Sequence, residues 1–222
     1  IIDLVVRLTI TPNNSAVIHA PTFGMYEHAV KVQGGTMNQL FLTPAPNFDL
    51  DADYLLANIN PRKDRLLFIC SPNNPTGNQF EENKVKKLIA EFPGIVAVDE
   101  AYSDFGGYSL TQKLADYPNL ILMKTFSKFF GLAGLRIGYS LSSELIATRM
   151  KEILPVYNVN AIAIACAKEL LDKQPVFSKA VQKIVTERER VYRELLKLDG
   201  IIPYQSKTNF IMFKSTKLRA LE

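Results

Sequence analysis

The sequence has few of the residues that build metal centres or disulfide frameworks. Only two cysteines and two histidines occur among its 222 residues. Cys70 and Cys166 lie in apolar stretches without metal-ligand spacing, so we expect two reduced core thiols and no metal site. With only His19 and His28 available, a histidine-based metal site is also not expected. This cysteine usage predicts a reducing compartment, the cytoplasm.

Long apolar runs and a strong excess of one charge are also lacking. No apolar run approaches the roughly 18 residues that a membrane span needs, so we expect no membrane partner. Lysine and arginine number 26 against 22 acidic residues, and the net charge of +4 is spread along the chain. This distribution does not favour a nucleic-acid partner. A hydrophobic fraction of 47% with 22% charged residues is typical of a globular protein and excludes a disordered chain.

Both ends of the sequence are unusual. The chain begins at Ile1 within an apolar helical pattern and has no initiator methionine, and it closes without an evident last element. We therefore expect an internal portion of a longer protein.

Short apolar runs alternate with helical periods along the first two thirds of the chain, which is typical of βαβ units around a mostly parallel sheet. Val85, Leu88, Ile89 and Phe92 follow helical spacing and predict a helix over 81–92 with one buried face. Strands are expected at 16–20, 66–70, 95–98, 120–123 and 137–141. The predicted fold is therefore α/β, with helices on both faces of the sheet.

The pattern changes after Ser142. Helices are expected over 145–153, 160–171 and 176–198, followed by a strand at 210–213, and the nearly all-apolar helix at 160–171 should be buried. We predict a large α/β domain over 1–154, lacking its N-terminal portion, and part of a smaller α+β C-terminal domain over 155–222.

Polar segments follow four of the predicted strands. In open parallel sheets, ligands bind at the carboxyl ends of the strands, so these segments should converge on one pocket. They are PTF at 21–23, NNPTG at 73–77, DEAY at 99–102 and TFSK at 125–128, the last followed by GLAGLR at 131–136.

Each segment has an ordinary structural explanation when taken alone. Asparagine, proline and glycine are common turn formers, and a carboxylate after a buried strand can cap a helix or form an ion pair. Lys128 fits a solvated lysine at a helix start, and Phe23 fits a core residue. Their order and joint placement at one sheet edge favour a binding site instead.

SPNNPTG, VAVDEAY and KTFSKFFGLAGLRIGY, in this order, resemble the pyridoxal-phosphate-dependent aminotransferases of fold type I, classes I and II. The resemblance is greatest to the histidinol-phosphate aminotransferase subgroup and is supported by PTFGMY, PNLILMKTFSK and the YNVN at 157–160. It covers nearly the whole chain and weakens after Phe213.

The resemblance implies pyridoxal 5′-phosphate as the cofactor and gives a role to each matching residue. Lys128 is the catalytic lysine, whose amine condenses with the cofactor's aldehyde and later moves a proton. Asp99 pairs with the pyridine nitrogen and keeps it protonated. Tyr102 and Asn74 hydrogen-bond the ring oxygen, and Phe23 stacks on the ring.

The resemblance also implies how the cofactor's phosphate is bound. Arg136 and Ser127 are the expected phosphate ligands, with Thr125 a weaker candidate. Tyr26 and Asn158 lie in motifs near the family's substrate pocket, although core packing explains either residue equally well. Two family features have no match here: a phosphate-binding loop before the first helix, and a C-terminal arginine that binds the substrate carboxylate. Arg219 lies in no matching motif.

The implied reaction is amino-group transfer from L-histidinol phosphate to 2-oxoglutarate, giving imidazole acetol phosphate and L-glutamate, in histidine biosynthesis. The implied assembly is a homodimer. Three alternatives remain: a threonine-phosphate decarboxylase, an aromatic amino-acid aminotransferase on the same scaffold, or a non-enzymatic aminotransferase-like regulatory domain.

Overall fold

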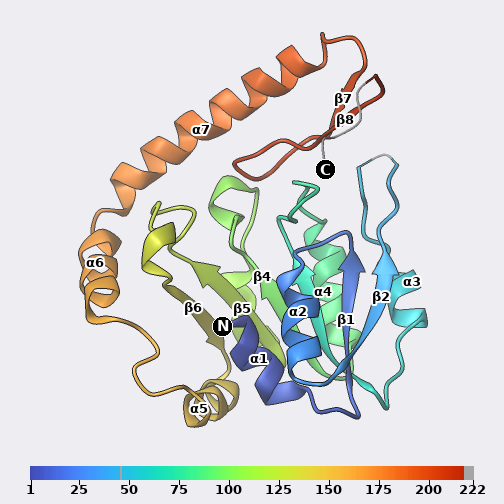
Figure 1. The fold of residues 1–222 in the computed structure, drawn as a ribbon, viewed down its shortest axis with the longest axis vertical. Coiled ribbons are helices and arrows are strands. Elements are labelled where there is room, and N and C mark those ends of the chain that lie inside the picture. The colour runs from blue at the N-terminus through green and yellow to red at the C-terminus, as the bar shows by residue number, and fades with distance from the viewer. Residues whose placement is uncertain (46, 218–222) are drawn as a thin grey trace.

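A computed structural model describes residues 1–45 and 47–217 (Figure 1). Its body is a six-stranded sheet with the strand order β2-β1-β3-β4-β5-β6. The first five strands run parallel, and β6 lies antiparallel to β5. The strands are β1 (Ser15–Ala20), β2 (Thr36–Phe41), β3 (Asp64–Cys70), β4 (Ile95–Asp99), β5 (Leu120–Thr125) and β6 (Gly138–Ser142). The α/β fold with a mostly parallel sheet is confirmed.

Helices cover both faces of this sheet. Along β3, Leu66 and Phe68 pack on one side with α1 (Ile2–Thr9), α2 (Met25–Val32) and α5 (Glu144–Glu152). Leu67 and Ile69 pack on the other side with α3 (Ala52–Ala57) and α4 (Glu82–Glu91). Because both faces are buried, the strand reads as a continuous apolar run rather than an alternating one. Each fully buried aliphatic or phenylalanine side chain contributes about 1.5–3 kcal/mol.

The sequence did not predict α2, β2 or α3. β2 is an edge strand in which only Leu40 is buried, so its hydrophobic pattern is weak. α3 has six residues, fewer than two turns, which is too short for a clear helical period. Three short 3₁₀ segments complete this part of the chain: η1 (Ser103–Phe105), η2 (Leu110–Asp116) and η3 (Ala133–Leu135).

A second part of the chain extends beyond the sheet. It comprises α6 (Ala161–Leu171), the long α7 (Gln174–Leu195), β7 (Ile201–Pro203) and β8 (Phe213–Ser215), and the two strands pair antiparallel. Figure 1 shows α7 crossing above the body, with β7 and β8 at its far end. The strand predicted at 210–213 begins at Phe213 instead. Thr208 and Phe210 hydrogen-bond each other locally, which keeps the preceding segment irregular.

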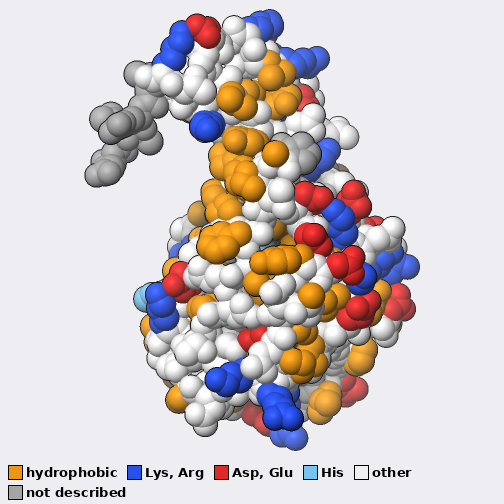
Figure 2. All heavy atoms as spheres, turned by 90° about the vertical axis from the view of Figure 1, so that its right-hand side faces the viewer, with side chains coloured by type: hydrophobic (Ala, Val, Ile, Leu, Met, Phe, Trp, Pro, Cys, Tyr) orange, Lys and Arg blue, Asp and Glu red, His pale blue; other side chains and the backbone are white. Residues whose placement is uncertain are grey.

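The prediction that the helix at 160–171 is buried is wrong. α6 buries Ala163 and Ala167, whereas Ile162 is 70% exposed and Ile164 is 42% exposed. Most apolar side chains of α6 are therefore not covered by the residues that the structure describes. On the side of the molecule away from α6, Figure 2 shows hydrophobic side chains gathered along the narrow part that joins the rounded body to the upper part.

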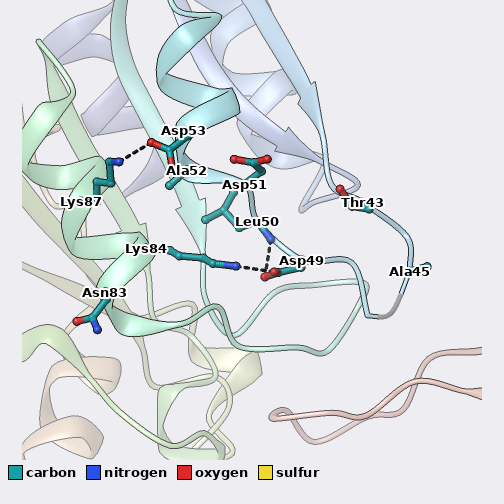
Figure 3. Close-up of a pocket in the computed structure, with 10 residues that line it drawn as sticks. All are labelled: Thr43, Ala45, Asp49, Leu50, Asp51, Ala52, Asp53, Asn83, Lys84 and Lys87. Atoms are coloured by element: carbon teal, nitrogen blue, oxygen red, sulfur yellow. Dashed lines mark hydrogen bonds and ion pairs between the residues drawn. The ribbon is translucent and has the colours of Figure 1, made fainter.

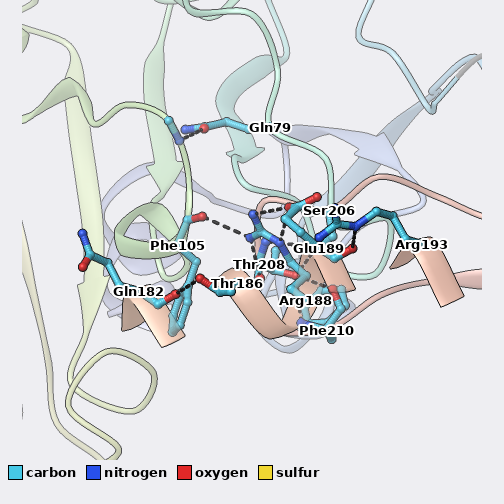
Figure 4. A network of polar contacts seen from close by, with 11 residues as sticks. Gln79, Phe105, Gln182, Thr186, Arg188, Glu189, Arg193, Ser206, Thr208 and Phe210 are labelled. Carbon is cyan, nitrogen blue, oxygen red and sulfur yellow. Dashed lines mark hydrogen bonds and ion pairs between the residues drawn. The ribbon is translucent and has the colours of Figure 1, made fainter. Parts of the chain in front are cut away.

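Arg188 of α7 connects the second part to the body (Figure 4). Its side chain is buried, and its guanidinium donates to the carbonyl oxygens of Phe105 in η1 and of Thr208. It also forms an ion pair with Glu189 at 2.9 Å. This single side chain therefore joins α7 to the turn that follows β4 and to the segment before β8. In the part of the chain that the structure describes, no helix is both long and apolar enough to cross a bilayer.

Candidate active site

The four polar segments lie at one edge of the sheet. Their strands β1, β3, β4 and β5 are parallel and adjacent, so their carboxyl ends point the same way. The first two segments are hydrogen-bonded to each other. Thr22 Oγ1 donates to Asn73 Oδ1 at 3.0 Å, and Asn73 Nδ2 donates to the carbonyl oxygen of Pro21 at 3.0 Å. The topology therefore places these two segments together, as the strand order requires.

Asn73 and Asn74 have different environments although they are neighbours. Asn73 is fully buried, and its amide also donates to Thr76 Oγ1 at 2.7 Å. Thr76 in turn donates to Asn78 Oδ1 at 2.5 Å. Asn74 is half-buried, so it is the asparagine of this turn that retains an accessible side chain. The hydrogen bonds by which Asn73 stabilises this turn were not predicted, because two neighbouring asparagines cannot be told apart by residue type alone.

The segment 206–210 packs against this turn and against the DEAY segment. The backbone N–H of Lys207 donates to the carbonyl oxygen of Gly77 at 2.6 Å. Gly77 has φ +80°, and a Cβ there would lie 2.9 Å from Ser206 Oγ. Both the left-handed backbone conformation and the lack of space for a side chain therefore favour glycine at this position. The ring of Phe210 contacts Tyr102 edge-on, at 5.4 Å between centroids. The sequence offered no signal for this contact.

Asp99 ends β4 and has one hydrogen-bond donor on each carboxylate oxygen. Tyr26 Oη donates to Oδ2 at 2.8 Å, and the backbone N–H of Ala101 donates to Oδ1 at 3.0 Å. Burial raises the pKa of Asp99, and these two hydrogen bonds partly oppose that rise. Among the described lysines and arginines, none forms an ion pair with this carboxylate. Asp99 is therefore held by neutral donors and remains free to pair with a cation from outside the chain.

The next residue, Glu100, belongs to a buried ion pair. Its side chain is 2% exposed, and its Oε2 lies 2.8 Å from Lys124 Nζ. Leu110 N–H donates to Oε1 at 2.7 Å, and Ser109 Oγ donates to Oε2 at 2.5 Å. Lys124 also donates to Ser103 Oγ at 3.0 Å. Lys124 thus forms a buried ion pair with Glu100 and has a structural role.

Lys128 lies in a different environment from Lys124. Its Nζ is 5.1 Å from the centroid of the Tyr102 ring, and the residue is half-buried. Among residues 1–45 and 47–217, no carboxylate forms an ion pair with it. Tyr102 itself is 6% exposed. The structure therefore brings an amine without an anionic partner next to the tyrosine of the DEAY segment.

The loop after β5 carries the residues expected to bind phosphate. Thr125 Oγ1 accepts the backbone N–H of Ser127 at 3.0 Å and lies 3.5 Å from the carbonyl oxygen of Ile137. Arg136 follows η3 in a left-handed conformation at φ 53° and is exposed. Its guanidinium donates to the carbonyl oxygen of Ala133 at 3.1 Å. The hydroxyl of Thr125 is occupied within the loop, whereas Arg136 presents an accessible cation.

The aromatic and substrate-pocket candidates differ in exposure. Phe23 is 38% exposed, and its ring meets Tyr26 edge-on with centroids 5.7 Å apart. Tyr26 is fully buried and does not line an open pocket. Asn158 is exposed in the connection between α5 and α6. Arg219 lies outside the described residues.

A separate surface hollow lies beside α3 and α4 (Figure 3). Asp49 and Asp53, which line it, form ion pairs with Lys84 and Lys87 of α4. Its lining includes none of the candidate site residues. The described residues also contain no cluster of histidine, cysteine or carboxylate side chains able to hold a metal ion.

The sheet is mostly parallel, and its carboxyl edge carries the amine of Lys128, the carboxylate of Asp99 and the loop with Arg136. This is the architecture of fold type I aminotransferases. The chain belongs to the class I and II aminotransferase family, whose model matches residues 1–220. The histidinol-phosphate aminotransferase of Cytophaga hutchinsonii is 41% identical over 217 residues, which are 96% of this chain and 62% of that protein. The enzyme of the same name from Thermoanaerobacter pseudethanolicus is 37% identical, over 96% of this chain and 60% of that protein.

A solved structure shows the same similarity. The histidinol-phosphate aminotransferase of Sinorhizobium meliloti, in complex with pyridoxal-5′-phosphate, superposes with a TM-score of 0.89 at 27% identity. The match covers 97% of this chain and 59% of that structure. The chain thus spans about three fifths of the length of the relatives that it matches.

Proposed function

We propose that the complete protein is a pyridoxal-phosphate-dependent aminotransferase that exchanges an amino group between L-histidinol phosphate and 2-oxoglutarate. One observation carries the proposal. Of the two lysines at the end of β5, Lys124 is ion-paired to Glu100, whereas Lys128 has no carboxylate partner among the described residues. The 41% identity to a histidinol-phosphate aminotransferase supports the substrate pair.

The side chains at the sheet edge match the chemical groups of the proposed cofactor. A pyridine nitrogen needs an anion, and Asp99 has a carboxylate without a cationic partner among the described residues. A phosphate dianion needs a cation and a donor, which the guanidinium of Arg136 and the hydroxyl of Ser127 supply. An aldehyde needs an amine, which Lys128 supplies. Phe23 offers an accessible aromatic face.

Each residue then has a defined task. When bound, the cofactor supplies an electron sink for the pair left on the substrate's Cα. Asp99 holds a proton on the pyridine nitrogen, which strengthens that sink. Tyr102 and Asn74 hydrogen-bond the ring oxygen. Lys128 would take the proton from the substrate's Cα, because no carboxylate among the described residues stabilises its ammonium form.

We further propose that the complete protein is a cytoplasmic homodimer. Two free thiols, Cys70 and Cys166, fit a reducing compartment. Val156 and Tyr157 are 81% and 96% exposed, and a second subunit would cover these apolar side chains. We also propose that residues 1–154 belong to a large cofactor-binding domain and 155–222 to a smaller one.

Borohydride trapping tests the proposal. The complete protein, incubated with pyridoxal phosphate and reduced, should carry the cofactor's mass on Lys128, and Lys128→Ala should carry none. Lys113→Met is the matched control, because it removes an exposed lysine of η2 and should leave the labelled site unchanged. Labelling at Lys124, or none at all, would refute the proposal.

An assay of the products tests the substrate. With L-histidinol phosphate and 2-oxoglutarate we expect glutamate to form. Release of carbon dioxide from threonine phosphate would instead identify a decarboxylase, and glutamate formed only from aromatic amino acids would identify an aromatic aminotransferase. Binding of the cofactor with no turnover of any of these substrates would favour a regulatory domain.

A further inference from the structure

Tyr26 donates a hydrogen bond to the carboxylate that we expect to face the pyridine nitrogen. The bond from Tyr26 Oη to Asp99 Oδ2 is 2.8 Å long and joins the start of α2 to the end of β4, 73 residues away. We propose that Tyr26 is a positioning residue, which holds the Asp99 carboxylate in the orientation and ionised form that the cofactor's ring nitrogen requires. This inference rests on the proposed function.

The contact geometry gives the Asp99 carboxylate one orientation. Oδ2 accepts from Tyr26, and Oδ1 accepts from the backbone N–H of Ala101 at 3.0 Å. Rotation of the carboxylate would break both bonds at once. Each oxygen keeps a second lone pair, so a third donor such as a pyridinium can still be accepted.

Tyr26 is itself held rigidly. Its side chain is fully buried, and its ring stacks on Phe68 of β3 with centroids 4.5 Å apart and planes 10° from parallel. Its ring also lies nearly perpendicular to that of Phe23, the residue that we expect to lie against the cofactor's ring. One buried tyrosine therefore touches both the expected stacking residue and the expected nitrogen partner.

The electrostatic surroundings make this donor important. Burial raises the pKa of Asp99, and the Tyr26 hydrogen bond is the leading influence that lowers it. The other titratable side chains that act on this pair are Glu100 and the Cys70 thiol. Burial raises the pKa of Cys70 to about 12, so this thiol stays neutral. Burial and the nearby Asp99 also raise the pKa of Tyr26, which therefore remains a neutral donor.

Removal of this donor should move the shared proton from the ring nitrogen toward the carboxylate. With ¹⁵N-labelled pyridoxal phosphate bound to the complete protein, Tyr26→Phe should shift the ¹⁵N resonance at pH 7.5 toward the unprotonated value. The same variant should lower kcat about tenfold with KM nearly unchanged. In the cofactor-free protein, ¹³C titration should show a higher pKa for the Asp99 carboxyl group than in the wild type.

Tyr108→Phe is the matched control, because Tyr108 Oη donates to the carbonyl oxygen of Phe80 at 2.8 Å, away from Asp99. It should leave the ¹⁵N resonance and the titration of Asp99 unchanged. If Tyr26→Phe also leaves both unchanged, the inference is wrong. If Lys128 is not labelled, or if Asp99→Asn leaves the ¹⁵N resonance in place, the proposed function fails instead. If Tyr26→Phe does not fold, 3-fluorotyrosine incorporated at position 26 replaces it as the test, because its hydroxyl is a stronger hydrogen-bond donor of nearly the same size. The ¹³C titration should then show a lower pKa for Asp99, and an unchanged pKa would overturn the inference.

Discussion

At the residue scale, two lysines four positions apart have opposite environments. Lys124 is anchored by Glu100 and Ser103, while Lys128 contacts the ring of Tyr102. A buried ion pair stabilises the ammonium form, whereas condensation with an aldehyde requires the free amine. The pairing of Lys124 is the reason why, of the two lysines in the KTFSK segment, we propose Lys128 for covalent chemistry.

Arg136→Ala tests the assignment of the phosphate ligand. We expect cofactor affinity to fall by about 2–4 kcal/mol, which is on the order of 30- to 1,000-fold in Kd, because a charge-assisted contact to a dianion is lost. Fluorescence titration of the complete protein with pyridoxal phosphate measures this change. Arg149→Ala is the control, since Arg149 is an exposed residue of α5 that pairs with Glu152. Equal affinity in the two variants would place the phosphate elsewhere.

His19 makes a second residue-scale prediction, on acid stability. It is fully buried, its Nε2 accepts the backbone N–H of Cys70 at 3.0 Å, and burial lowers its pKa to about 3. The unfolded chain, with a pKa of about 6.5, binds the proton first, so stability falls as pH drops from about 6.5 toward 3. Between pH 7 and pH 5 this loss amounts to about 2 kcal/mol.

Urea unfolding at the two pH values measures this loss. His19→Gln should unfold with a smaller difference between pH 7 and pH 5 than the wild type. His28→Gln, on the exposed side of α2, should retain the full difference. An unchanged pH dependence in His19→Gln would show that other groups cause the acid sensitivity.

At the element scale, the Glu100–Lys124 pair joins the ends of β4 and β5. Glu100 lies directly after Asp99, and Lys124 is the penultimate residue of β5, four positions before Lys128. Two further donors, from Ser109 and Leu110, bind the same carboxylate. The two strand ends that carry the expected catalytic residues are therefore held together by a buried charge pair.

Glu100→Gln should destabilise the protein by about 3 kcal/mol, because it leaves the Lys124 ammonium largely buried without its counter-ion. The double variant Glu100→Gln/Lys124→Met should recover part of this loss, since no uncompensated charge remains. Urea midpoints of the single and double variants give the coupling free energy. Strictly additive losses would contradict a direct interaction between the two side chains.

At the scale of the whole molecule, the two parts of the chain are joined through Arg188. Its two backbone acceptors, on Phe105 and Thr208, belong to segments that also contact the site: η1 follows Tyr102, and the 206–210 segment contacts Gly77. Loss of the hydrogen bonds of Arg188 should therefore affect both the position of α7 and the geometry at the sheet edge.

Arg188→Met tests this connection between the two parts. It should lower the free energy of unfolding by about 2–4 kcal/mol, because two buried carbonyl oxygens lose their donor. Arg190→Met on the same helix is the matched control. Arg190 is exposed and pairs only with Glu187 among the described ion pairs, so we expect less than about 1 kcal/mol. Thermal unfolding of both variants measures the difference, and equal effects would show that Arg188 does not join the two parts.

Much of the architecture follows from local sequence pattern. The apolar runs at 66–70, 95–98 and 120–123 predicted buried parallel strands, and each appears within a few residues of its expected bounds. The helix with Val85, Leu88 and Ile89 on one face is α4. These features depend on neighbouring residues, whose periodicity is visible in the chain itself. The motifs at the strand ends were predicted to lie at one edge of the sheet, and they do, because parallel topology aligns those ends.

Only the tertiary structure decided which polar groups meet. Tyr26 and Asp99 are 73 residues apart, and nothing local marks them as partners. The resemblance assigned Asn74 and Lys128, but the hydrogen bonds of Asn73 and the ion pair of Lys124 depend on contacts with distant segments. The exposure of α6 shows the same limit of sequence-based prediction. An apolar helix is expected to be buried, but its sequence does not say which surface covers it. Hydrophobic periodicity is a local property, whereas hydrogen bonding and ion pairing depend on three-dimensional proximity.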